Sequence, residues 1–202
     1  MKAQLEASSI GLSVTAAVKP AYESIMNQDA MAFVLALAQR FQARRNELLK
    51  DRVAVQKRLD AGELPVFLPE TKSIRESDWK VAPIPQDLQN RRVEITGPAE
   101  PKMIINALNS GAKVFMADLE DSLSPTWEKV VEAQQALYDA VRRTLVYHSP
   151  EGKDYKLNAD NLAVLIVRPR GWHLNEKHVQ YQGEPIAGAL LDFGLVFYHN
   201  AK

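Results

Sequence analysis

The spacing of hydrophobic residues divides the chain into a helical N-terminal part and a C-terminal part in which strands and helices alternate. Between Asp29 and Leu59, large apolar residues recur at roughly helical spacing, with arginines and lysines between them. Asn27 can cap this predicted helix and Gly62 can end it. We expect the arginines of this helix to form a solvated face.

Regular patterning is absent from the segments on either side of this helix. Residues 1–20 read as a weakly ordered lead-in. Residues 63–90 contain four prolines and predict a linker that wraps around the next domain, with Trp79 anchoring it on an apolar surface. We therefore divide the chain into an N-terminal helical part with its linker, residues 1–90, and a second domain, residues 91–202.

From residue 91 onward, short apolar strands alternate with helices. The predicted elements, in the order strand, helix, strand, helix, strand, are 93–96, 102–108, 114–117, 125–141 and 162–167. This order implies a parallel sheet of the α/β class. Ser124 is the expected cap of the second of these helices, with Pro125 at its first position. Two small hairpins are expected around 147–157 and 179–185, and a last helix begins at Gly188.

The apolar run 162–167 is rich in β-branched residues, which is typical of a parallel strand covered on both faces. Large aromatic side chains elsewhere in the second domain are expected in the core. These are Trp127, Trp172, Phe193 and Phe197. The second domain is therefore predicted to be a layered α/β structure with a buried sheet.

Composition narrows the class of protein. Lys plus Arg and Asp plus Glu both number 25, so no global basic field favours nucleic acid or an anionic membrane. No cysteine is present, which excludes disulfides, thiolate catalysis and Cys-based zinc sites. The four histidines lack metal-ligand spacing, and we expect His173 and His178 to be structural or exposed. The N-terminus resembles neither a signal nor a transit peptide, so a cytoplasmic location is expected, without membrane or nucleic-acid partners.

Polar residues follow each of the three predicted strands. They are Thr96–Pro98, Asp118–Ser122 and Arg168–Gly171. Because the carboxyl ends of parallel strands lie at one edge of a sheet, we expect these segments to meet there. The sequence contains no P-loop, no G-x-G-x-x-G and no G-x-S-x-G motif.

The residue types at this edge suggest handling of an anion. An arginine can hold a carboxylate through two hydrogen bonds, or stabilise charge that builds on an enolate oxygen. Asp118 and Glu120 alternate along the chain, so both should face the same side. They could hold magnesium, directly or through its waters. Alternatively, they could orient an arginine by an ion pair.

Purely structural explanations exist for the same residues. The acidic run 118–121 could be a solvated loop. Arg168 and Arg170 could form structural ion pairs with Asp121 or Glu94. The placement of acidic and basic residues at the same end of neighbouring strands favours a functional site.

Three segments closely resemble the malate synthase family in its bacterial and glyoxysomal form. They are RRVEITGP (91–98), KMIINALNSGAKVFMADLEDSLSPTW (102–127) and VRPRGWHLNEKH (167–178). Residues 62–80 and 190–202 match the family too, so the resemblance covers nearly the whole chain from about residue 27.

The resemblance implies an enzyme that condenses acetyl-CoA with glyoxylate and water to give malate and CoA, with Mg2+, in the glyoxylate cycle. It implies a (β/α)8 TIM barrel preceded by a helical clasp. Residues 1–90 would form the clasp and its wrapping linker. Residues 91–202 would form the first part of the catalytic barrel, with its first three strands, so the barrel is incomplete in this chain.

The resemblance also assigns roles to individual residues. Arg168 falls on the family's catalytic arginine, which contacts glyoxylate and the developing enolate. Ser122 falls where related enzymes contact acetyl-CoA. Asp118 and Glu120 fall near the water shell of the metal.

The family's magnesium ligands and its aspartate base lie on later strands, beyond Lys202. We therefore expect no metal ligand in this chain, and expect the isolated polypeptide to be inactive and prone to aggregation. Two alternatives remain. One is a non-catalytic fragment or paralogue that only binds or regulates. The other is a different magnesium-dependent lyase acting on CoA thioesters.

Overall fold

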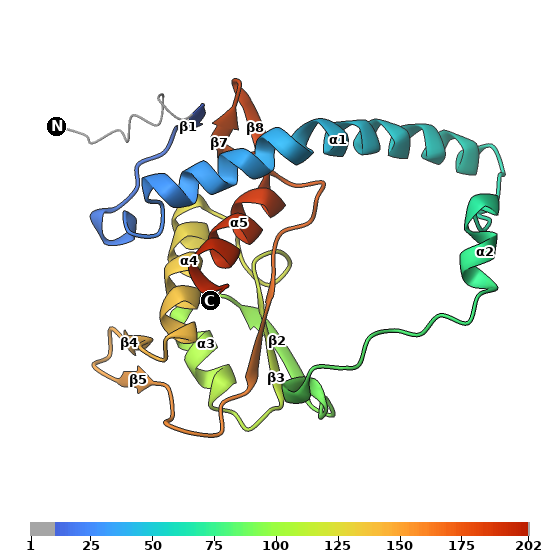
Figure 1. Cartoon of the computed structure of the whole chain (residues 1–202). Helices are drawn as coiled ribbons and strands as arrows, with labels where there is room; N and C mark the ends of the chain where they lie inside the picture. The colour runs from blue at the N-terminus through green and yellow to red at the C-terminus, as the bar shows by residue number, and fades with distance from the viewer. Residues whose placement is uncertain (1–10, 202) are drawn as a thin grey trace.

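A three-stranded parallel sheet lies at the centre of the C-terminal part of the chain (Figure 1). The computed structural model describes residues 11–201. The strands, in spatial order, are β2 (Glu94–Pro98), β3 (Val114–Asp118) and β6 (Val164–Arg168). Their register aligns Pro98 with Asp118, and Asp118 with Arg168, at the carboxyl edge. The predicted parallel α/β series is therefore confirmed.

Two helices connect these strands and cover one core. They are α3 (Pro101–Leu108) and α4 (Trp127–Val141), and their buried apolar residues pack with Phe115 and Leu119. Pro101 stands in the first turn of α3, where its missing N–H costs nothing. The predicted cap Ser124 was wrong: Thr126 is the residue whose side chain accepts from the amide of Lys129. The helix therefore begins two residues later than the Pro125 start that we expected.

A long helix crosses the other side of the molecule. Helix α1 (Gln28–Asp60) begins where Asn27 accepts a hydrogen bond from the amide of Ala30, as expected. Its first half packs on α5 (Gly188–Asn200) in a second apolar core (Figure 1). A Cβ on Gly194 would lie 2.9 Å from Val34 Cγ2, so this glycine permits the close approach of the two helices.

Antiparallel hairpins decorate the sheet and helices. The elements are β1 (Leu12–Val14), β4 (Val146–His148), β5 (Asp154–Lys156), β7 (Asn175–Tyr181) and β8 (Glu184–Ala187). The order β1-β7-β8 forms one small sheet and β4-β5 another, which confirms both predicted hairpins. The expected weakly ordered lead-in was wrong for residues 12–14, because β1 pairs with β7. The first ten residues of that lead-in, and Lys202, lie outside the described residues.

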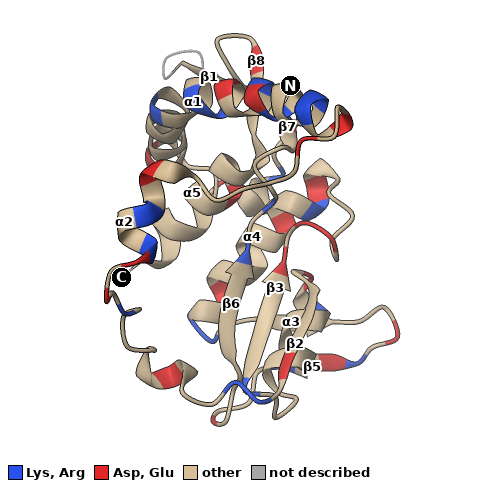
Figure 2. Cartoon of the chain, turned by 90° about the vertical axis from the view of Figure 1, so that its right-hand side faces the viewer, with Lys and Arg blue, Asp and Glu red and all other residues tan. Residues whose placement is uncertain are grey.

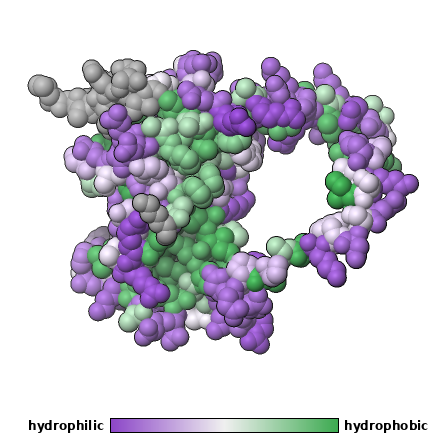
Figure 3. All heavy atoms as spheres, viewed as in Figure 1, coloured by the Kyte–Doolittle hydropathy of each residue, from purple (hydrophilic) through white to green (hydrophobic). Residues whose placement is uncertain are grey.

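The segment between α1 and β2 extends away from the rest of the molecule (Figures 1 and 3). It contains the short helix α2 (Lys72–Arg75) and 3-10 turns at Pro69–Thr71 and Gln86–Leu88; a third such turn, Pro20–Tyr22, precedes α1. Trp79 is 60% exposed, so the expectation that it anchors this linker on an apolar surface was wrong. Other large apolar side chains of the linker are also exposed: Leu64, Val66, Phe67, Leu68, Ile74, Val81 and Ile84.

Strand β6 is half-buried along its whole length, in contrast to the predicted strand with both faces covered. It pairs with β3 on one side, and in the described part of the chain no strand pairs with its other side. Trp172, Phe193 and Phe197 are about half exposed, so their assignment to the core was wrong. No helix within residues 11–201 is long and apolar enough to cross a membrane.

Candidate functional site

Opposite charges meet at the carboxyl edge of the parallel sheet (Figure 2). Asp118 ends β3 and Arg168 ends β6, and their Cα atoms are partners in the strand register. The amide of Leu119 donates to the carbonyl of Arg168 at 3.0 Å, which continues the pairing beyond the strands. The predicted meeting of the acidic and basic segments is therefore confirmed.

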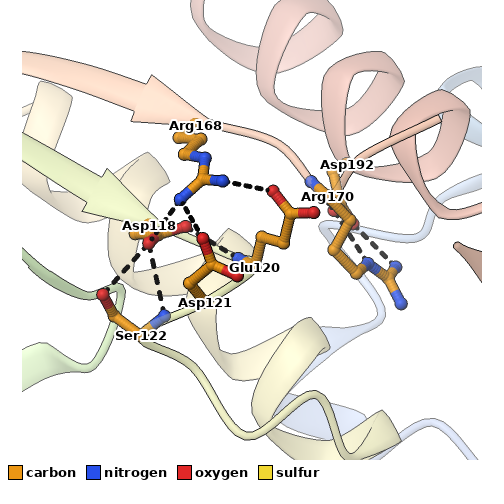
Figure 4. A network of polar contacts seen from close by, with 7 residues as sticks. All are labelled: Asp118, Glu120, Asp121, Ser122, Arg168, Arg170 and Asp192. Carbon is orange, nitrogen blue, oxygen red and sulfur yellow. Dashed lines mark hydrogen bonds and ion pairs between the residues drawn. The ribbon is translucent and has the colours of Figure 1, made fainter. Parts of the chain in front are cut away.

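The Arg168 guanidinium contacts three carboxylates (Figure 4). Its Nη1 lies 3.1 Å from Asp118 Oδ2 and 2.7 Å from Asp121 Oδ2, and its Nη2 lies 2.6 Å from Glu120 Oε2. The hydrogen bond with Asp121 and the negative charges around it raise the pKa of Arg168, against a lowering by desolvation. Arg168 is therefore a fixed cation, and at 37% exposure it remains accessible from solvent.

Asp118 organises the loop that follows β3. Its side chain is 1% exposed, its Oδ1 accepts from the amide of Glu120, and its Oδ2 accepts from the amide and hydroxyl of Ser122. An aspartate that binds amides a few residues ahead is a common turn-former. Burial raises the pKa of Asp118, but these hydrogen bonds and Arg168 lower it more, so it lies below its usual value. The ion-pair alternative for Asp118 and Glu120 is thus the arrangement observed.

Ser122 and Asp121 lie on the outer side of this loop. Ser122 is exposed, and its hydroxyl donates to Asp118 Oδ2 at 3.0 Å. Asp121 is 73% exposed and reaches back to Arg168. The structural pairing of Arg168 with Asp121 that the sequence left open is therefore present. The same guanidinium also contacts Asp118 and Glu120, the two carboxylates that we expected in a functional cluster.

Gly171 lets the loop after β6 approach the Glu120 carboxylate. A Cβ at Gly171 would lie 2.7 Å from Glu120 Oε1 and 2.9 Å from His173 Nδ1. Any side chain there would displace one of these groups. His173 is exposed, as expected, yet its ring lies against the same glycine as the Arg168-bound glutamate.

Arg170 belongs to a separate buried network. It donates to Glu176 and Asp192, so its predicted partners Asp121 and Glu94 were wrong. Sequence reasoning missed both carboxylates. The available signal was Asp192, an isolated charge within the apolar run LLDFGLVF, where a buried carboxylate needs a partner.

Arg45 departs from the expected solvated face of α1. It is buried, and it donates from Nε to the carbonyl of Trp172 at 2.7 Å and from Nη2 to Asn175 Oδ1 at 2.8 Å. Burial lowers its pKa. The neighbouring Arg44 is exposed and pairs with Glu47, as a solvated arginine does. Helix α1 is therefore hydrogen-bonded through Arg45 to the loop that follows β6.

A cavity of about 630 Å3 lies between α1 and the loop after β6. Its walls include Phe41, Leu48, Trp172 and His173, and it does not include Arg168. The cavity surface is mainly apolar, although Arg44, Arg45, Asp51 and Arg52 also line it, and the cluster of carboxylates around Arg168 lies outside it.

The described residues do not by themselves fit a magnesium site. Within 11–201, no group of three or more His, Asp or Glu side chains is arranged to hold a metal ion. The carboxylates of Asp118, Glu120 and Asp121 are all directed at Arg168 (Figure 4). Any metal at this edge would need ligands from outside the described residues.

Family models match two parts of the chain. The N-terminal domain of malate synthase matches residues 11–73, and the malate synthase TIM barrel domain matches residues 164–202. The second match includes Arg168 and the loop that follows it.

Curated relatives match almost the whole chain. Malate synthase of Myxococcus xanthus is 55% identical over 95% of this chain and 35% of that protein. Malate synthase A of Escherichia coli is 53% identical over 88% of this chain and 33% of that protein. The glyoxysomal malate synthase of Zea mays is 50% identical over 94% of this chain and 34% of that protein.

The chain thus spans about a third of the length of the curated relatives it matches. Both family models and all three relatives carry one family name. The barrel model includes Arg168, and the matches to the relatives, over 88–95% of the chain, extend over the acidic loop as well. The chain belongs to the malate synthase family and corresponds to its N-terminal portion.

Proposed function

We propose that this chain supplies the helical clasp, residues 1–90, and the first three barrel strands, within 91–202, of an active malate synthase. The reaction joins acetyl-CoA, glyoxylate and water to give malate and CoA. The observation that carries the proposal is Arg168 at the carboxyl end of β6, held by the loop after β3. Identities of about 50% to relatives named malate synthase support it.

Arg168 is the residue of this chain that acts on the reacting atoms. A base removes a proton from the acetyl methyl group, and the resulting enolate attacks the aldehyde carbon of glyoxylate. Negative charge develops on the thioester oxygen, and a positioned guanidinium stabilises such charge. The same group suits the glyoxylate carboxylate, because it donates two parallel hydrogen bonds. Water then cleaves the thioester and releases CoA.

Asp118, Glu120 and Ser122 support this arginine. Asp118 and Glu120 hold the two Nη atoms, so the guanidinium is oriented before substrate arrives. Ser122 stands exposed at the edge of the loop, where we place the acetyl-CoA contact. The base is expected outside this chain.

Magnesium is part of the proposal through the family resemblance alone. When bound, it would supply positive charge to the glyoxylate oxygens. Its ligands are expected outside residues 1–202, with Asp118 and Glu120 near its water shell.

We also propose that the protein works in the cytoplasm and in the glyoxylate cycle. Relatives from maize and castor bean are named glyoxysomal, so a peroxisome-type compartment is the alternative.

The test is a full-length chimera in which all 202 residues replace the matching part of the M. xanthus enzyme, which is 55% identical. Acetyl-CoA and glyoxylate are supplied with magnesium, and malate and free CoA are measured. We expect equal amounts of both products, dependent on glyoxylate. A folded chimera that releases no CoA would contradict the proposal.

A non-catalytic binding role is the second candidate. It is favoured by the described sheet, which has three strands and, within residues 11–201, unpaired edges on β2 and β6. In that case the chimera would bind acetyl-CoA without forming malate. The names of the relatives argue against a different CoA-thioester lyase.

A further inference from the structure

The loop that follows Arg168 is fixed from inside the protein by a buried ion network. Arg170 is 4% exposed, and Asp192 of α5 is fully buried. Asp192 Oδ2 accepts from both the backbone amide and Nε of Arg170, at 3.0 and 2.9 Å. Asp192 Oδ1 accepts from Nη2 at 2.8 Å (Figure 4). One carboxylate therefore holds the side chain and the backbone of the residue two places after Arg168.

Two neighbouring elements complete the network. Glu176 of β7 accepts from Arg170 Nη1 at 2.7 Å, and it also accepts from the amide of His178 at 2.9 Å. A Cβ on Gly188, at the start of α5, would lie 2.9 Å from Arg170 Nε. The guanidinium is thus enclosed by β7 and α5, and it has little freedom to move.

Burial of these charges is poorly explained by stability alone. Removing a carboxylate and a guanidinium from water costs several kcal/mol per ion, and apolar residues of similar volume often serve stability as well or better. This trio carries two negative charges and one positive charge. What it provides is a defined geometry, because bidentate pairing fixes both distance and orientation.

A chain of contacts connects this network to Arg168. Arg170 is followed directly by Gly171, whose missing side chain leaves room for Glu120 Oε1. The other oxygen of that carboxylate, Oε2, holds Arg168 Nη2 at 2.6 Å. The backbone at residues 170–171 therefore packs against the Glu120 carboxylate and restricts its position, while that carboxylate orients Arg168.

We propose that Asp192 is a positioning residue for Arg168, acting through the backbone of Arg170 and Gly171 and through Glu120. This inference rests on the proposed function, because it assigns Arg168 to the reaction. Asp192 touches no reacting atom. Its effect is to hold the backbone of residues 170–171 in the position that packs against Glu120.

The test uses the full-length chimera with Asp192→Asn, which keeps the shape of the side chain. We expect kcat to fall by about 10- to 100-fold, as for a displacement near 1 Å, while KM for acetyl-CoA changes less than about twofold. Leu195→Val is the matched control, because Leu195 is buried on the same helix within the apolar core shared with α1, and the network's hydrogen bonds do not involve it. It should lower the melting temperature and leave kcat unchanged.

A double-mutant cycle tests the route. If Asp192 acts through Glu120, the loss in Asp192→Asn/Glu120→Gln stays close to the larger single loss, because coupled residues are non-additive. If the fold-losses in kcat of the two single variants multiply in the double variant, the proposed route through Glu120 is overturned. If kcat for Asp192→Asn stays within about twofold of the parent, the positioning role itself is overturned. If Asp192→Asn does not fold, Glu176→Gln takes its place in the same cycle, with the same two outcomes.

Hydrogen exchange separates this inference from the proposed function. Amide exchange in the peptide 167–174 is measured in the chimera with and without Asp192→Asn. Faster exchange is expected even if the parent chimera forms no malate, and that result would fault the proposed function alone. Unchanged exchange would contradict the positioning role whatever the activity.

Discussion

Arg168 and Glu120 are joined by a 2.6 Å hydrogen bond between the ends of two adjacent parallel strands. Glu120 follows β3 and Arg168 ends β6, so the bond depends on the pairing of those strands. The same glutamate rests against Gly171. The geometry of the candidate site is therefore set by contacts on both sides of one carboxylate.

Asp121 should compete with the anionic substrate for Arg168. Its side chain is 73% exposed, and exposed ion pairs are worth at most about 1 kcal/mol. We expect Asp121→Asn in the chimera to lower KM for glyoxylate by up to about fivefold, with kcat little changed. Steady-state kinetics at fixed acetyl-CoA measures this. A rise in KM would show that Asp121 assists binding and does not compete.

The lowered pKa of Asp118 predicts a stability contribution that depends on pH. A carboxylate whose pKa is lower in the folded state stabilises the protein above its unfolded value, about 3.9. That contribution is lost as the pH falls through the folded value. Asp118→Asn should therefore be less stable than the parent by about 1.5–3 kcal/mol at pH 7, the range for hydrogen bonds to charged groups.

Urea unfolding of the full-length chimera at a series of pH values, with and without Asp118→Asn, checks this prediction. The difference between the parent and Asp118→Asn should shrink as the pH is lowered below about 3.9. Asp154→Asn is the matched control, since that carboxylate is exposed. A difference for Asp118→Asn that does not change with pH would contradict the prediction.

Gly171→Ala should disturb catalysis more than stability. The added methyl group would lie 2.7 Å from Glu120 Oε1, so the carboxylate that orients Arg168 must shift. We expect kcat in the chimera to fall by about 10- to 100-fold. Gly194→Ala is the control, because its methyl group would meet Val34 and Leu37 on α1, away from the site. It should lower the melting temperature and spare kcat, and the opposite pattern would refute the role of Gly171.

Alanine substitutions at Arg45 and Arg44 should lower the free energy of unfolding by very different amounts, although the two residues are neighbours in the sequence. Arg45→Ala removes the hydrogen bonds that the buried guanidinium donates to the carbonyl of Trp172 and to Asn175, and a hydrogen bond to a charged group contributes about 1.5–3 kcal/mol. Arg44→Ala removes only an exposed pair with Glu47, worth less than about 1 kcal/mol. Urea unfolding of the full-length chimera carrying each substitution measures both effects. Equal losses of stability would mean that the contacts of Arg45 with the loop after β6 do not stabilise the protein.

The sheet and its charged edge were predictable because they depend on local patterns. The apolar runs at 114–117 and 162–167, separated by a helix, fix a parallel pair whose ends must meet. That pairing is enough to bring Asp118 and Glu120 to Arg168. The family resemblance then added roles that the spacing alone could not give.

The buried partners of Arg170 were not predictable in the same way. Asp192 lies on a helix that returns after the β7–β8 hairpin, and only the three-dimensional packing brings it to Arg170. Strand β1 escaped prediction for a similar reason, since its three residues depend on pairing with distant β7. Trp79 and Trp172 were expected to be covered, but both are more than half exposed.

Arg170→Ala is not a neutral comparison for Arg168, because it would leave Asp192 and Glu176 buried without a cation. A better control is Arg91→Ala. Arg91 is exposed, pairs with Glu94, and lies before the amino end of β2, away from the carboxyl edge of the sheet. Its loss should leave turnover in the chimera within about twofold of the parent.

The most direct test of the account is malate formation by the chimera with and without Arg168→Ala. Loss of one charge-stabilising donor is worth about 10²–10³-fold in kcat. We predict a fall of that size for Arg168→Ala and none for Arg91→Ala, with both variants folded. Turnover by Arg168→Ala within a few-fold of the parent would contradict the role assigned to this arginine.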